Sequence, residues 1–166
     1  MIPWAQRSVE ERSLLSPSFC GILLWHAASG YRQESERGLS LEESFLVLPI
    51  VLHHRTRDAL PRDVRTSLAV WLQEHPLIRG RLADRAKALA PYTREGLLFA
   101  GIRGILRFPG AAVEADVSHR SAVTTTLREI ASDEVSACTK RSIFVGRWFA
   151  RAGGPSTVLA LWGVKP

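Results

Sequence analysis

The chain has 166 residues, of which 46% are hydrophobic and 23% are charged, and its formal net charge at pH 7 is +6. This balance predicts one domain with a real hydrophobic core and excludes an intrinsically disordered protein. The longest apolar run, residues 45–52, contains Pro49 and is too short to span a bilayer, so a membrane protein is excluded as well.

The positive charge is concentrated in the middle of the chain. Residues 61–110 carry nine basic and four acidic side chains. Such an excess suits nucleic acid or an acidic protein surface. It can also reflect only a GC-rich genome, because 19 of the 22 basic residues are arginine.

The cysteine content and the N-terminus indicate the compartment. Cys20 and Cys138 are far apart in the sequence and have no partner at metal-ligand spacing. The first residues show no basic region followed by an apolar stretch, as a secretory signal requires. We therefore expect a cytoplasmic protein without disulfides.

The sequence predicts a single domain, 1–166, with three sub-parts, of which 14–60 is the first. Ser16-Pro17 opens a helix that ends before Gly38, because serine caps free amides and proline suits the first turn. Ser40 and Glu43 form a capping box. It opens a second, very apolar helix, which we expect to bend near Pro49.

The second sub-part, residues 61–116, predicts three helices followed by a hairpin. The helices cover about 64–75, 77–90 and 93–104, the last behind a Thr93 cap. Residues 105–116 alternate around Pro109-Gly110, which is typical of a β-hairpin. This order predicts a winged helix-turn-helix-like core, with the hairpin as its wing. The fold class is therefore mainly α, or α+β with a small β-hairpin.

The third sub-part, residues 117–166, ends in an unusually apolar tail. A helix over 132–152 stops at Gly153-Gly154, and a two-turn helix follows Pro155. Trp148 and Phe149 are about 100° apart on the first of these helices, so both are buried only if it is covered on two sides. Either a partner covers one side or the terminal helix folds back over Phe149. We take Trp148, Phe149 and Trp162 as candidate partner-binding residues.

No motif indicates catalysis, a metal or a cofactor. Adjacent His53 and His54 face different sides of a helix and cannot chelate one ion together. Both cysteines lie on apolar helix faces, and no nucleophile elbow or Walker loop is present. We predict that the chain is not an enzyme and has no catalytic, metal or cofactor-binding residues.

Three arginines are candidates for nucleic-acid contact. Arg94, Arg103 and Arg107 lie on or beside the predicted third helix and wing, where arginine can pair with phosphates or base edges. The helix itself, "GLLFAGIRGIL", is too apolar to lie in a major groove. We therefore favour contact with protein over direct contact with DNA.

Four separated segments together resemble a known family, the middle component of three-component ABC systems. These are bacterial defence operons, of which the Lamassu type is the best known. The resemblance covers roughly residues 14–108 and 132–166. It is carried by "LLSPSFCGILLWHAASGY", "FLVLPIVLHHRTRDALPRDVRTSLAVWLQEHP", "APYTREGLLF" and "GRWFARAGGPSTVLALWGVKP".

The resemblance implies a small non-enzymatic subunit that links an SMC-like (Rad50-like) ABC ATPase to an effector, often a nuclease. It further implies that DNA is reached through the complex, with no membrane and no small-molecule substrate involved. Two alternatives remain open at this point. One is a stand-alone winged-helix DNA-binding regulator, and the other is a hydrolase without a recognisable signature.

Overall fold

The computed structural model describes residues 15–164 together with Gln6 and Ser8. The described part is mostly helical and has one small antiparallel sheet, which confirms the predicted mainly α class. The N-terminal residues that bear on a secretory signal lie almost entirely outside the described part. In chain order the elements are α2 (Pro17–Glu34), β1 (Leu39–Ser40), α3 (Leu41–Val51), α4 (His54–Ala59), α5 (Leu68–Glu74), α6 (Pro76–Ile102), β2 (Leu106–Arg107), β3 (Ala112–Ala115), η2 (Val117–His119), α7 (Arg120–Glu129), α8 (Asp133–Ala152) and α9 (Pro155–Trp162).

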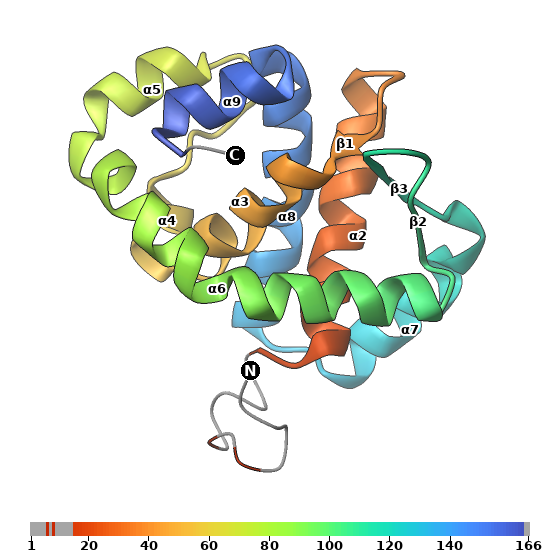
Figure 1. The fold of residues 1–166 in the computed structure, drawn as a ribbon. Helices are drawn as coiled ribbons and strands as arrows, with labels where there is room; N and C mark the ends of the chain where they lie inside the picture. Colours follow the sequence, from red (N-terminus) through yellow and green to blue (C-terminus); the bar gives the residue numbers. More distant parts are fainter. Residues whose placement is uncertain (1–5, 7, 9–14, 165–166) are drawn as a thin grey trace.

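Helix α2 is the centre of the structure. Ser16 caps it as predicted, accepting a hydrogen bond from the amide of Phe19 at 3.2 Å. Helices α8, α6 and α3 and strand β3 all pack against α2, and Figure 1 shows α8 beside it and α6 running across it. Because the helix is covered on most sides, its apolar residues do not form a single stripe.

The predicted capping box at the start of α3 is confirmed. The amide of Glu43 donates to Ser40 Oγ at 3.1 Å, and the amide of Ser40 donates to Glu43 Oε2 at 3.0 Å. Glu43 is fully buried. Pro49 lies inside α3, two residues before the helix ends.

The predicted boundary between the second and third helices of the middle sub-part is wrong. Residues 76–102 form one continuous helix, α6, with Pro91 inside it. Thr93 is no N-cap, since its hydroxyl donates to the carbonyl oxygen of Leu89 one turn earlier at 3.1 Å. Packing on α2 outweighs the local break signal, because Thr93, Gly96 and Ala100 are buried on this face. The winged helix-turn-helix-like core is therefore not confirmed, since a helix-turn-helix needs a turn at this place.

The predicted hairpin around Pro109-Gly110 is confirmed, and Gly110 takes the positive φ of 62° that the turn requires. Strands β2 and β3 pair antiparallel, with Leu106 opposite Ala115. Strand β1 adds to the other side of β3, placing Leu39 opposite Val113 and giving the order β1-β3-β2. This third strand, and helix α7 after the hairpin, were not predicted.

Both predicted C-terminal helices are present. Ser132 caps α8 through the amide of Val135 at 3.1 Å, and the helix stops at Gly153. Helix α9 follows Pro155 and ends at Gly163, which has a left-handed backbone with φ of 69°. Helix α9 packs against α3, α5, α6 and α8, so the tail folds back onto the rest of the chain.

Candidate partner-binding surface

The predicted tail residues lie in the chain's own core. Trp148 and Trp162 are 1% exposed and Phe149 is 0% exposed. Trp148 and Phe149 are thus both covered by the chain itself, in line with the alternative in which the terminal helix folds back. A partner can touch these side chains only if the structure around α9 opens.

Trp71 of α5 joins the two tail tryptophans. Its ring lies 5.4 Å from that of Trp148 and 6.1 Å from that of Trp162, both in edge-to-face arrangements. Trp148 also donates its indole N–H to the carbonyl oxygen of Thr66 at 2.7 Å. These contacts hold α5, α8 and α9 together, which is a structural role for the tail.

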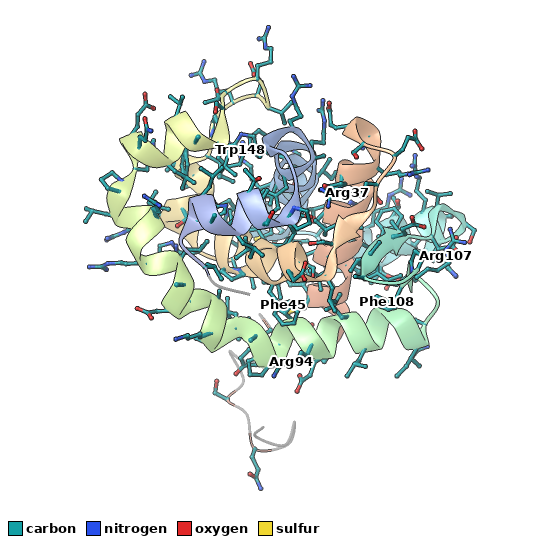
Figure 2. The ribbon with its side chains drawn as sticks, turned by 45° about the horizontal axis from the view of Figure 1, so that its top comes forward. Arg37, Phe45, Arg94, Arg107, Phe108 and Trp148 are labelled. Carbon is teal, nitrogen blue, oxygen red and sulfur yellow. The ribbon has the colours of Figure 1, made fainter. Side chains whose placement is uncertain are left out.

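The three candidate arginines are exposed and lie along α6 and the hairpin. Arg94 lies over the ring of Phe45 at 6.0 Å, and Arg103 lies over Phe99 at 5.4 Å. Arg107 Nε is 3.8 Å from a carboxylate oxygen of Asp116. Figure 2 shows Arg94, Phe108 and Arg107 following one another along α6 and into the hairpin.

Exposed apolar side chains lie between these arginines. Leu98 is 64% exposed, Ile102 is 84% exposed and Phe108 is 43% exposed. Arg94, Leu98 and Ile102 are spaced by four residues and therefore share one face of α6. A Cβ on Gly101 would lie 2.8 Å from the Phe108 ring, so Phe108 packs against the end of α6. We call this region the α6–hairpin surface and define it by Arg94, Leu98, Ile102, Arg103, Arg107 and Phe108.

The chemistry of this surface favours a protein partner. Exposed aliphatic and aromatic side chains lower the free energy of a complex when a partner removes them from water. A phosphate backbone offers arginine a counter-charge, but it offers Leu98 and Ile102 nothing apolar. Arginines beside a buried apolar centre are typical of protein–protein interfaces.

Sequence reasoning identified the arginines but missed Leu98, Ile102 and Phe108. The spacing of Arg94, Leu98 and Ile102 was visible in the sequence. Its meaning depended on which face of the helix packs inward. Gly96 and Ala100 supply that face, and their small size lets α6 approach α2 closely.

Among the described residues, no three or more histidine, cysteine, aspartate or glutamate side chains lie close enough to hold a metal ion. None of the described helices has both the length and the apolar composition needed to cross a membrane.

Comparison with known proteins supports the general kind of protein that the resemblance indicated, and it does not single out the Lamassu type. Residues 4–166 match the family model described as ABC-three component (ABC-3C) system Middle Component 3. No curated protein and no solved structure matches the chain. Because the family model spans nearly all of its length, the chain belongs to the Middle Component 3 family of ABC-three component systems.

Proposed function

We propose that this chain is a non-enzymatic assembly subunit that links an SMC-like ABC ATPase to an effector, as in Lamassu-type defence against phage or plasmids. The effector is of the nuclease type, and DNA is reached through the complex, in the cytoplasm. Family membership supports the general role of a system component. The observation that carries the proposal is the α6–hairpin surface, where Ile102 is 84% exposed beside arginines.

The mechanism requires that the partner's state changes the binding free energy. This subunit can release or activate a bound effector only if ATP or DNA binding by the ATPase changes the affinity between the effector and the subunit. Trp148 and Trp162 contribute by fixing the positions of α5, α8 and α9 through their contacts with Trp71, and Phe149 contributes by its burial in the core. Their effect on partner binding is therefore indirect.

Co-purification tests the assembly role. The tagged full chain is expressed with the two other components of its system, and the lysate is treated with nuclease before purification. We expect both components to be recovered in fixed proportion with the chain.

The stand-alone regulator makes the opposite prediction. The chain alone would bind duplex DNA with steep salt dependence, and this binding would be lost on replacing Arg94, Arg103 and Arg107. Tight DNA binding by the isolated chain, together with no recovery of the other components, would overturn the proposal.

A further inference from the structure

An open pocket lies at the N-terminal end of α6, beside α4. Its volume is about 660 Å³, and Figure 1 shows α4 next to the N-terminal half of α6. Arg55 comes from α4, and Arg81 and Arg85 come from α6, whereas Asp84 is the one carboxylate among the lining residues. The pocket therefore carries a positive excess.

Arg85 is the least exposed arginine of this pocket. Its Nη1 donates to the hydroxyl of Thr56 at 2.9 Å, but its Nε is buried without a hydrogen-bond partner. Burial, and next the charge of Arg81, lower the pKa of Arg85. Among the described residues it forms no ion pair, unlike its neighbour Arg57, which contacts both carboxylate oxygens of Glu134 at 2.8 Å.

The surroundings of His53 show the same positive field. Its Nδ1 accepts the amide N–H of Thr56 at 3.2 Å, which places the ring proton on Nε2. Burial is the main cause that lowers the pKa of His53, followed by Arg85 and Arg55. A bound anion would offset the positive charge around both His53 and Arg85.

The rim of the pocket includes one strongly exposed apolar side chain among charged ones. Leu77 is 78% exposed and lies four residues before Arg81 and eight before Arg85, on the same face of α6. A ligand that fills the site therefore presents a negative group and an apolar group side by side. A protein segment with a carboxylate next to an aliphatic residue fits. A nucleic acid fits less well, because its phosphate backbone offers the exposed Leu77 no apolar partner.

We propose that this pocket binds an acidic segment of another component of the system, with one carboxylate on Arg85 and an aliphatic neighbour on Leu77. Arginine suits this role because its planar guanidinium pairs with carboxylate through two parallel hydrogen bonds. This inference rests on the proposed function and adds a second contact site. Leu77 and Ile102 are 25 positions apart on one helix, roughly 37 Å, so two partners can bind the chain together.

Crosslinking in the nuclease-treated complex tests the inference. A photo-crosslinking amino acid replaces Leu77, and in a parallel protein it replaces Ile102. From position 77 we expect attachment to a peptide of another component that contains Asp or Glu beside an aliphatic residue. Attachment to nucleic acid, or to a peptide without a carboxylate, overturns the inference.

Charge reversal gives the second readout. The double substitution Arg55→Glu and Arg81→Glu should weaken retention of that component by about tenfold or more. The exposed Arg128→Glu is the control for a charge reversal elsewhere on the surface. Unchanged retention of both components in the double variant overturns the inference and leaves the proposed function standing. Failure of the unmodified chain to recover any component overturns the proposed function itself.

Discussion

Gly146 of α8 lies so close to Ala27 of α2 that a Cβ on Gly146 would overlap the Ala27 carbonyl oxygen. One turn away, a Cβ on Gly30 would overlap the carbonyl oxygen of Ile143. Helices α2 and α8 therefore meet backbone to backbone. The same device recurs where α6 crosses α2, since a Cβ on Gly96 would lie 2.9 Å from the Cβ of Cys20.

This contact makes Gly146→Ala strongly destabilising. The added methyl meets backbone, which cannot rotate away, so the helices must separate at a cost of about 1–3 kcal/mol or more. The matched control is Gly80→Ala in α6, where a Cβ meets nothing within 4 Å. Alanine there should raise stability by about 0.5–1 kcal/mol, because glycine is unfavourable inside a helix. Urea unfolding of the three proteins measures both effects, and a Gly146→Ala protein as stable as the original would refute the backbone contact.

The buried capping box predicts opposite results for two substitutions of Glu43. Burial is the main cause that raises the pKa of the Glu43 carboxyl above its ordinary 4.5. Glu43→Gln keeps an oxygen that accepts the Ser40 amide and removes the buried charge, whereas Glu43→Ala loses the cap at a cost of about 0.5–2 kcal/mol.

The pH dependence of the Glu43→Gln effect has a defined sign. A carboxyl whose pKa is raised in the folded protein contributes its stabilisation below the unfolded pKa and loses it as pH rises through the folded pKa. The Gln variant should therefore match the original protein near pH 4 and become the more stable of the two towards pH 7. Thermal unfolding across this range measures the difference, and a Gln variant that is less stable at pH 7 would contradict the argument.

Neither cysteine should react in the folded protein. Cys20 and Cys138 are 0% and 1% exposed. Burial is the main cause that raises the pKa of Cys20 to about 12 and raises that of Cys138. Because the thiolate is the reactive form, a thiol reagent at pH 8 should label neither residue until denaturant is added. Rapid labelling of the native chain would show that one helix opens far more readily than its packing indicates.

The tryptophan contacts predict that the tail acts through stability. Trp162→Ala should lower the free energy of unfolding by about 3–5 kcal/mol, because it removes a ring buried against Trp71. Trp162→Phe should lower the free energy of unfolding by a smaller amount. Partner retention should fall in the same order as stability. Loss of a partner without loss of stability would instead indicate that Trp162 leaves the core and contacts the partner itself.

Helix caps and the hairpin turn, which depend on neighbouring residues, were predictable from the sequence. Packing and pairing between distant segments were not. Ser16, Ser40 and Ser132 each cap a helix where predicted, and Pro109-Gly110 forms the hairpin turn. The continuity of α6 through Pro91 was missed, because buried contacts with α2 offset the lost amide. The pairing of β1 with β3 joins residues more than 70 positions apart, so no local pattern encodes it.

The candidate site shows the same division. The arginines were identified by their charge, which is visible in any fold. Leu98 and Ile102 resemble core residues in the sequence, and they prove exposed only because α6 turns Gly96 and Ala100 towards α2. Phe149, by contrast, was a candidate partner-binding residue and is buried, because its exposure depends on how the whole chain covers α8.

In the proposed function, the α6–hairpin surface binds another component of the system. The direct measurement is the affinity of the full chain for that component after nuclease treatment, with Ile102→Asp compared against Val70→Asp. Val70 is 50% exposed on α5 and serves as the matched control. We expect Ile102→Asp to weaken binding by about tenfold or more, while Val70→Asp leaves binding unchanged and both variants stay folded. Equal affinity of the Ile102→Asp chain and the original chain would show that this surface does not bind the component.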